Sequence, residues 1–249
     1  MIILKSPREL EKMRAANKIV AETHAYLAEH LEAGISTAEI DRLGEEFIKK
    51  AGGIPSFKGY HGYPAALCIS INEEVVHGIP SKKRIIEEGD LVSIDIGVYY
   101  DGFHGDAARS YGIGRISEEA ERLIKVTEES FFAGIKKALL GNRLTDISHA
   151  IQKHAESNGF SVVRDYVGHG IGQKMHEDPQ VPNFGKPNRG PLLKAGMTLA
   201  IEPMINLGTY RVKTLDDGWT VVTADGMLSA HYENTIAITE EGPEILSRI

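Results

Sequence analysis

The order of apolar and polar positions predicts that the chain begins with two helices. Ser6-Pro7-Arg8-Glu9 combines an N-cap serine, a proline at the first helical position and a capping-box glutamate, and apolar residues follow at helical spacing toward Gly34. A second capping box, Ser36-Thr37-Ala38-Glu39, predicts another helix that closes at Gly52-Gly53. We therefore expect two capped helices before the first strand.

Strand-like segments follow, and the same order then repeats. Alternating apolar residues and β-branched residues predict strands at 66–71, 91–98 and roughly 103–111. The second half predicts helices at 117–140 and 145–158, then strands near Leu199, Thr220 and Glu233. Two similar halves, roughly 1–112 and 113–249, indicate one pseudo-symmetric α+β catalytic domain. We expect its helices to pack on one face of a largely antiparallel sheet.

Composition narrows the class of protein. The 249 residues are 42% hydrophobic and 25% charged, which suffices for a well-filled core. The formal charge of -7 argues against nucleic acid as a substrate, because binding it needs clustered basic residues. The one cysteine, Cys68, excludes an internal disulfide, and the apolar start Met1 to Leu4 is too short for a signal peptide or membrane span. We expect a soluble, cytoplasmic protein without a membrane partner.

Acidic residues interrupt segments that should be apolar. Val92, Ile94, Ile96 and Val98 share one face of their strand, so Asp95 lies on the other face, in a position that disfavours aspartate. A hairpin turn at 99–102 would return Asp106 beside Asp95. Glu202 and Glu233 also fall on the less apolar faces of predicted strands. Each acid alone is more often an edge residue that faces water, but four in one chain weaken that interpretation.

Convergence of the four acids would predict a metal site. Two like charges about 4 Å apart repel by roughly 4 kcal/mol at an effective dielectric constant of about 20, so converging acids must protonate or bind cations. Two divalent ions would balance four carboxylates. His169, inside Gly168-His169-Gly170-Ile171-Gly172, could add an imidazole, and its glycines would let the backbone approach a ligand closely. This loop could equally be a tight turn. Oxygen-rich ligation with one imidazole suits Mn, Fe or Co, and Zn is allowed.

Two further histidines lie beside turn-forming residues on predicted loops, where groups that contact substrate commonly sit. They are His77, in Val76-His77-Gly78-Ile79-Pro80, and His176, in Met175-His176-Glu177-Asp178-Pro179. For each histidine alone, a surface position is about as frequent as a functional one.

Taken together and in order, the motifs resemble those of bacterial type I methionine aminopeptidases, which have the creatinase-like, or pita-bread, fold. They are Gly59-Tyr60-His61-Gly62-Tyr63-Pro64, Cys68-Ile69-Ser70-Ile71-Asn72-Glu73, His77-Gly78-Ile79-Pro80, Asp95-Ile96-Gly97, Gly105-Asp106, Gly168-His169-Gly170-Ile171-Gly172, Ile201-Glu202-Pro203 and Tyr232-Glu233-Asn234-Thr235. The resemblance implies a metalloaminopeptidase that removes the N-terminal methionine from nascent proteins and prefers a small, uncharged second residue.

The resemblance also implies roles for the metal ligands. Asp95 chelates one metal, Asp106 and Glu233 bridge both, and His169 and Glu202 complete the shell of the other. Two such ions would hold a bridging water, lower its pKa and polarise the scissile carbonyl for attack on the first peptide bond. Glu202 would also shuttle the proton.

The resemblance assigns the remaining site residues to substrate binding. His77 and His176 match catalytic, substrate-contacting histidines, and the methionine pocket carries over to Tyr60, Tyr63, Cys68 and Trp219, whose aromatic surfaces suit a thioether.

Three residues depart from the family pattern: Met175 replaces a usual phenylalanine, Phe57 a smaller residue and His231 a usual glutamine. We expect all three beside the substrate channel or the metals. His231 has the strand parity of Glu233, so we expect it beside a metal ligand, with a titration near neutral pH.

Two rival interpretations stay open. An Xaa-Pro aminopeptidase or prolidase would use the same metals but usually carries an additional N-terminal domain. A non-enzymatic pita-bread protein that binds peptides would typically have lost metal ligands. We expect a monomer that acts on the N-terminal peptides of nascent proteins. Transient association with the ribosome is compatible with this activity. Ligand type leaves the physiological metal open.

Overall fold

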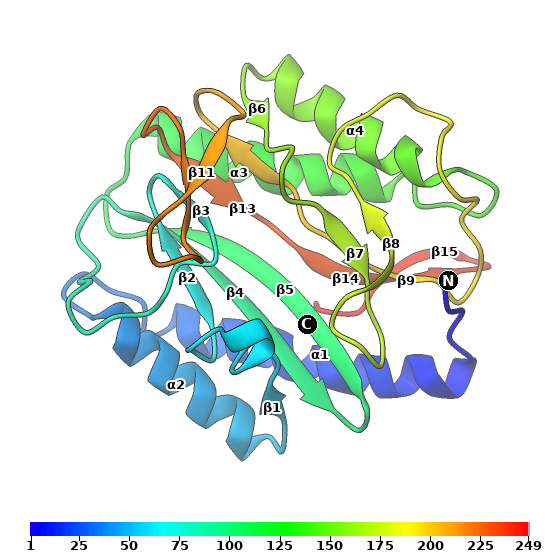
Figure 1. Ribbon diagram of the computed structural model, residues 1–249, viewed down its shortest axis with the longest axis horizontal. Helices are drawn as coiled ribbons and strands as arrows, with labels where there is room; N and C mark the ends of the chain where they lie inside the picture. The colour runs from blue at the N-terminus through cyan, green and yellow to red at the C-terminus, as the bar shows by residue number, and fades with distance from the viewer. Residues whose placement is uncertain (249) are drawn as a thin grey trace.

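Two pairs of helices lie outside a layer of antiparallel strands in the computed structural model, which describes residues 1–248 (Figure 1). One pair comes from each half of the chain: α1 (Pro7–Ala28) with α2 (Thr37–Lys50), and α3 (Glu118–Ile135) with α4 (Leu144–Ser157). The expected α+β arrangement is therefore confirmed. Among residues 1–248, every helix is too short or too polar to cross a lipid bilayer.

The helix boundaries follow the capping signals with two corrections. The Ser6 hydroxyl accepts a hydrogen bond from the Glu9 amide, and the Glu9 carboxylate accepts one from the Ser6 amide, so the first capping box is complete. At α2 only Ser36 caps, because the Glu39 carboxylate binds the guanidinium of Arg42 instead.

The second correction concerns the end of α3. This helix ends at Ile135 and does not reach Leu140, because the amides of Lys137 and Ala138 close tighter three-residue turns.

Within residues 1–248 the strands form four hydrogen-bonded sheets in which all pairs are antiparallel. In the first sheet, β4 (Leu91–Tyr100) pairs with β5 (Phe103–Gly112) along one edge and with β1 (Ile54–Pro55) and β2 (Cys68–Ile71) along the other. The order of the largest sheet is β15 (Gly242–Ile245), β14 (Asn234–Thr239), β9 (Thr198–Ile201), β7 (Gly168–Gly170) and β8 (Glu177–Val181). The 3-10 helix η1 (Tyr60–Gly62) precedes β2.

Two three-stranded sheets complete the layer. One joins β6 (Ser161–Val162), β10 (Met204–Asn206) and β13 (Ser229–His231), and the other joins β3 (Glu74–Val76), β12 (Val221–Thr223) and β11 (Val212–Thr214).

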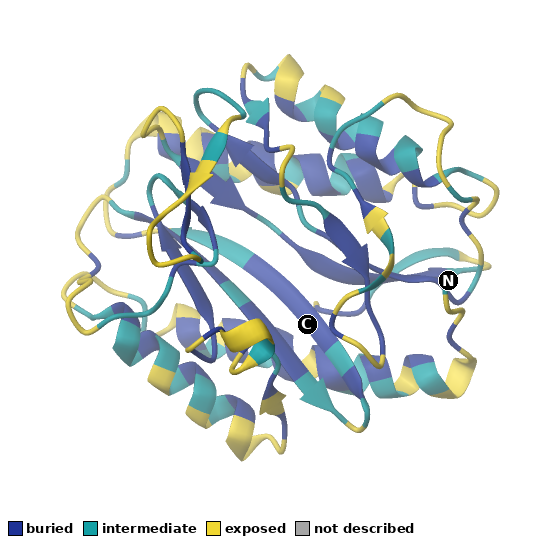
Figure 2. Ribbon diagram, in the orientation of Figure 1, coloured by how far each residue is buried: buried dark blue, intermediate teal, exposed yellow. Residues whose placement is uncertain are grey.

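Strand β4 separates the core from the functional face. Val92, Ile94, Ile96 and Val98 are fully buried against apolar residues of α1 and α2. Figure 2 shows this burial as dark blue strands between helices whose outer surfaces are exposed. Because successive side chains of a strand point to opposite faces, core packing on one side turns Asp95 away from the helices.

The β4–β5 hairpin brings two acids to the same face. Its two-residue loop, Asp101-Gly102, has φ values of 47° and 87°, the positive values that a type I′ turn requires. The resulting register pairs Gly97 with Asp106, so Asp106 lies diagonally across from Asp95 on one face. The predicted hairpin is therefore present.

Glu202 and Glu233 were expected within strands, and this prediction is wrong. Glu202 lies in the break between β9 and β10, and Glu233 lies in the break between β13 and β14. Pro203 has no amide hydrogen for a ladder bond, and its carbonyl instead accepts from the Tyr232 amide. The two breaks are thus held side by side where the chain passes from one sheet to the next.

Candidate metal centre and peptide pocket

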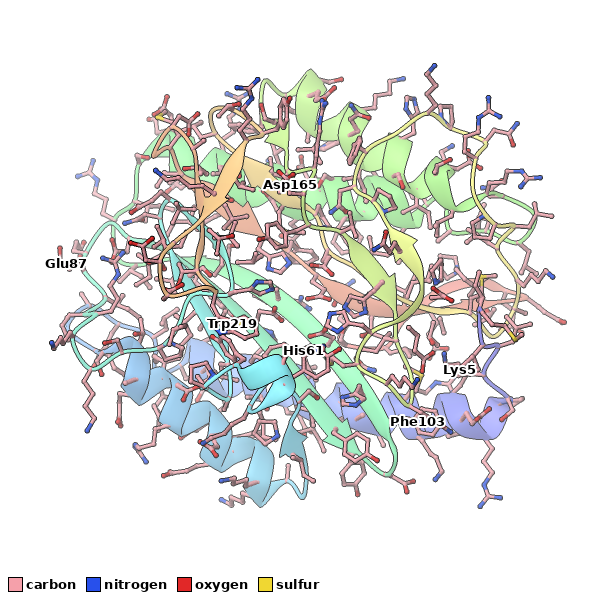
Figure 3. The ribbon with its side chains drawn as sticks, viewed as in Figure 1. Lys5, His61, Glu87, Phe103, Asp165 and Trp219 are labelled. Carbon is pink, nitrogen blue, oxygen red and sulfur yellow. The ribbon has the colours of Figure 1, made fainter. Side chains whose placement is uncertain are left out.

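Four acids and one histidine from distant parts of the sequence line a single cavity of about 240 Å³. Asp95 comes from β4, Asp106 from β5 and His169 from β7, while Glu202 and Glu233 come from the two strand breaks. The other lining residues are His61, Phe57, Tyr60, Tyr63, Cys68, His77, Met175, His176 and Trp219. Figure 3 shows His61 and Trp219 in front of β4 and β5.

The side chains of the five residues face one another across the cavity, and His169 lies farther than hydrogen-bond distance from two of the acids. His169 Nε2 lies 3.7 Å from Asp106 Oδ2 and 3.7 Å from Glu202 Oε1, beyond normal hydrogen-bond length. Ligand atoms of Asp106, His169 and Glu233 all lie within 4.8 Å of one another. Such spacing leaves room for a cation between the groups.

The acids carry buried oxygens that bind nothing in the described chain. Asp95 Oδ1, Asp106 Oδ1 and Glu233 Oε1 are buried without a hydrogen-bond partner among residues 1–248. Burial raises the pKa of Asp95 to about 7. Burial, followed by repulsion from neighbouring acids, raises the pKa values of Asp106, Glu202 and Glu233 well above their usual range. The donor set therefore fits divalent cations, which would satisfy these oxygens.

His169 is oriented as a ligand by its own backbone. Its Nδ1 lies 2.9 Å from the Gly170 carbonyl oxygen, to which it must donate a hydrogen bond. In the neutral ring Nε2 then carries no hydrogen, and its lone pair faces the acids. Burial lowers the pKa of His169 to about 3, so the imidazole is neutral.

The glycines beside His169 make room for the neighbouring strands. A Cβ at Gly168 would lie 2.4 Å from the Ala200 carbonyl oxygen, and one at Gly170 would lie 2.1 Å from the Asp178 carbonyl oxygen. Close approach of β8 and β9 to β7 thus requires both glycines.

Hydrogen bonds to the backbone fix two of the acids, and sequence analysis missed the residues that make them. The Asp106 amide donates to Thr235 Oγ1 at 3.1 Å, and Thr235 Oγ1 donates to the Asp106 carbonyl at 2.9 Å. The Arg109 guanidinium donates to the Glu233 carbonyl and, at 2.7 Å, to Asn234 Oδ1. Arg109 is a basic residue in the middle of a predicted strand, and this unusual position was the signal in the sequence that could have identified it.

The residues predicted to form a methionine pocket pack together in one apolar cluster. Phe57, Tyr63, Cys68 and Met175 are buried in it, and Tyr60 and Trp219 pack against it half-buried. Cys68 pairs with Asp95 in the β2–β4 register, so the pocket opens beside the acids. Burial raises the pKa of the Cys68 thiol well above its usual range, which keeps it protonated and apolar.

Phe57 fits only because its neighbour on β4 has no side chain. A Cβ at Gly97 would lie 2.7 Å from Phe57 Cε1. The Asp95-Ile96-Gly97 motif therefore combines an acid for the centre with the space for a pocket wall.

Three histidines surround the boundary between the pocket and the acids. His176 Nδ1 lies 2.8 Å from the Tyr60 hydroxyl, and its ring centroid lies 4.1 Å from that of His169. His77 has its ring near those of Tyr166 and Trp219, and burial lowers its pKa to about 4. His61 was not predicted, although the motif that contains it was recognised.

His231 lies behind Glu202, with Nε2 3.7 Å from Glu202 Oε2. The strand parity with Glu233, from which its place was expected, does not apply, because β13 ends at His231 and Glu233 lies in the break before β14. Burial lowers its pKa to about 3, with a smaller contribution from His77. The expected titration near neutral pH is therefore wrong, because the enclosed ring stays neutral there.

Comparisons with known proteins place the chain in a family. Residues 11–240 match the profile of "Metallopeptidase family M24", and the chain belongs to that family. It is 65% identical to the methionine aminopeptidase of Clostridium perfringens, with 100% of both chains covered. It is 57% identical to methionine aminopeptidase 1 of Bacillus subtilis over the same coverage.

Solved structures place the fold within the same group. The methionine aminopeptidase of Thermotoga maritima superimposes with a TM-score of 0.98 at 49% identity, with 100% of both chains covered. The prolidase of Pyrococcus horikoshii superimposes with a TM-score of 0.79 at 23% identity, and 64% of that chain is covered. The second similarity is one of fold alone.

Proposed function

We propose that this chain is a metal-dependent methionine aminopeptidase that releases the N-terminal methionine of a peptide. The observation that carries the proposal is an apolar pocket that opens directly onto a cluster of buried acids and one imidazole. The pocket would hold the thioether side chain, and the cluster would hold the cations beside the first peptide bond. The high identity to methionine aminopeptidases over the full chain supports the same activity.

Asp95, Asp106, His169, Glu202 and Glu233 are the residues that would hold two divalent ions, and Asp106 and Glu233 would serve both. The partnerless oxygens and the neutral imidazole support this assignment. Divalent ions bound there would supply a water of lowered pKa and a Lewis acid for the scissile carbonyl. Mn, Fe, Co and Zn all suit the donor set.

The chain's own groups would orient the peptide and move the proton. Glu202 is the proposed proton shuttle, since its carboxylate faces the cavity and burial raises its pKa. His176 uses Nδ1 toward Tyr60, which leaves Nε2 to contact the peptide, and His77 lies across the pocket mouth beside Trp219. Both imidazoles would contribute orientation and charge stabilisation.

Substrate range and setting belong to the same proposal. The substrates would be N-terminal peptides of nascent proteins with a small, uncharged second residue, met through transient contact with ribosomes. The enzyme would act in the cytoplasm as a monomer with one catalytic domain that spans residues 1–249. The single cysteine and the net charge of -7 support this setting.

The test is an assay of methionine release from a Met-Ala-Ser peptide by metal-free protein to which Mn, Fe, Co or Zn is added. An Xaa-Pro peptide serves as the matched control under the same conditions. We expect methionine release with at least one metal and no cleavage of the Xaa-Pro peptide. Cleavage of the Xaa-Pro peptide alone would favour a prolidase, and no cleavage with any metal would favour a peptide-binding protein.

A further inference from the structure

The N-terminal arm, residues 1–6, is fastened to the rest of the protein by a buried ion pair. Lys5 Nζ lies 2.5 Å from Glu177 Oε2, and the two side chains are only 3% and 4% exposed. The surface pair Lys18–Glu22 is looser by comparison, at 3.7 Å and largely in solvent. Figure 3 shows Lys5 just before the start of α1. Exposed ion pairs contribute little to stability, and burying an ion pair costs desolvation energy. A buried pair at this position therefore indicates a specific role.

Glu177 directly follows two residues of the proposed site, Met175 and His176. Its second oxygen, Oε1, accepts a hydrogen bond from the Lys174 amide at 3.1 Å. One carboxylate thus binds the arm and closes the loop of residues 172–177 that carries both site residues.

Lys5 also fills the inside of that loop. A Cβ at Gly172 would lie 2.5 Å from Lys5 Cε and 2.7 Å from Glu177 Oε1, so the ion pair packs directly against the loop backbone. The Gly172 carbonyl accepts from the His104 amide at 2.8 Å, which ties the start of the loop to β5. The loop is therefore fixed at its start by β5, and at its end by Lys5 together with the pairing of Glu177 in β8 with Gly170 in β7.

The arm itself has a fixed position. The Lys5 amide donates to the Gly196 carbonyl at 2.7 Å, and the next residue, Ser6, caps α1. The ammonium group of Met1 pairs with Asp178, the neighbour of Glu177. The short arm thus forms ion pairs with two consecutive acids, Glu177 and Asp178, at the start of β8.

We propose that Lys5 is a positioning residue, which through Glu177 holds the loop of residues 172–177 so that Met175 walls the methionine pocket and His176 faces the metal centre. This inference rests on the proposed function for the roles of Met175 and His176. Removing either partner leaves a buried charge unpaired, and a shift of about 1 Å in a positioned group can cost on the order of a hundredfold in rate.

The experiment compares Lys5→Met, the double variant Lys5→Met/Glu177→Gln and the control Lys18→Met, which removes a lysine from an exposed pair. The double variant removes both buried charges, so it separates the cost of an unpaired charge from the loss of positioning. Methionine release from Met-Ala-Ser, bound metal, thermal stability and amide hydrogen exchange of residues 172–178 are measured for each.

We expect Lys5→Met to lower kcat/KM by about ten- to a hundredfold, with metal content equal to that of wild type and faster exchange in the loop. The double variant should recover stability but keep the low rate, and Lys18→Met should match wild type. A kcat/KM within twofold of wild type in Lys5→Met, or recovery of both stability and rate in the double variant, would overturn the inference.

Failure of the proposed function gives a different result. A wild-type protein that releases no methionine contradicts the function, and the hydrogen exchange then decides the positioning role alone. Equal exchange of residues 172–178 in wild type and the double variant would overturn that role without any assay of activity.

Discussion

The guanidinium of Arg109 donates a hydrogen bond to the main-chain carbonyl of Glu233, directly behind the carboxylate that faces the cavity. Arg109 also donates to the Ser247 carbonyl at 3.2 Å and lies 4.6 Å from the centroid of the Tyr232 ring. One half-buried cation therefore joins β5, the strand break and the C-terminal segment. Glu233 lies outside the strands on either side of it, and this contact fixes its position together with a pair of main-chain hydrogen bonds between Glu233 and Ala108 of β5.

Replacing Arg109 should weaken metal binding. Arg109→Met removes the donor behind Glu233, and partners that orient a ligand typically contribute about 10–100-fold in metal affinity. Calorimetric titration of metal-free protein with Mn measures the change. Arg122→Met is the matched control, since Arg122, near the start of α3, stacks on Phe160 and donates to the Asn158 carbonyl. Metal affinity equal to wild type in Arg109→Met would show that Glu233 needs no such support.

Removing a proposed bridging ligand should stop turnover. Asp106→Ala deletes the carboxylate that we propose as a bridge between the ions, so we expect methionine release to fall by more than about a hundredfold, beyond the loss typical of partners that only orient a ligand. Bound metal per chain should fall at the same time. The exposed Asp165→Ala serves as control. A near-wild-type rate together with two bound ions in Asp106→Ala would refute the assignment.

Metal-free protein should become less stable as the pH rises. The pKa of Asp95 is raised to about 7 by burial, and burial and repulsion between the acids raise those of Asp106, Glu202 and Glu233 well above their usual range. A group with a raised folded-state pKa stabilises the fold fully below its unfolded pKa and loses this contribution as the pH rises through the folded value. We therefore expect the Tm of metal-free protein to fall between about pH 5 and 8.

Added divalent metal should reverse this trend, because cations replace the protons on the same oxygens. Differential scanning calorimetry with and without chelator measures the stabilisation by metal, which should grow with pH. Asp106→Asn, with one carboxylate fewer, should show a shallower fall in Tm without metal. Stabilisation by metal that is independent of pH would contradict the convergence of the acids.

His231→Gln should leave the pH profile of turnover unchanged near neutrality. Burial lowers the pKa of His231 to about 3, so the ring that faces Glu202 carries no proton to lose in that range. Turnover of Met-Ala-Ser by His231→Gln and wild type, measured across the same buffers, should give parallel profiles. A titration step near neutral pH that disappears only in the variant would restore the role first expected of His231.

Local patterns predicted those parts of the fold that depend on local rules. The complete capping box at Ser6, the Asp101-Gly102 turn and the alternation around Asp95 each follow from the chemistry of a few neighbouring residues. Glu202 and Glu233 were placed wrongly within strands, because the ladder ends where one sheet gives way to the next, and that depends on partners far away in the chain.

The supports of the site were harder to predict than its ligands. Lys5 meets Glu177 across 172 positions of sequence, and Asp106 meets Thr235 across 129. Nothing in the spacing of these residues encodes the contact, since only the packed sheets bring them together. The pKa of His231 escaped prediction for the same reason, because enclosure by the whole fold determines it.

The central claim is that methionine release depends on cations held by the buried acids. The most direct test is to titrate divalent metal into metal-free protein and to record bound metal and methionine release from Met-Ala-Ser in the same samples. We predict no release without metal, a rise that follows occupancy of the site, and loss of release when chelator is added. Methionine release at full rate by protein shown to contain no metal would contradict the account.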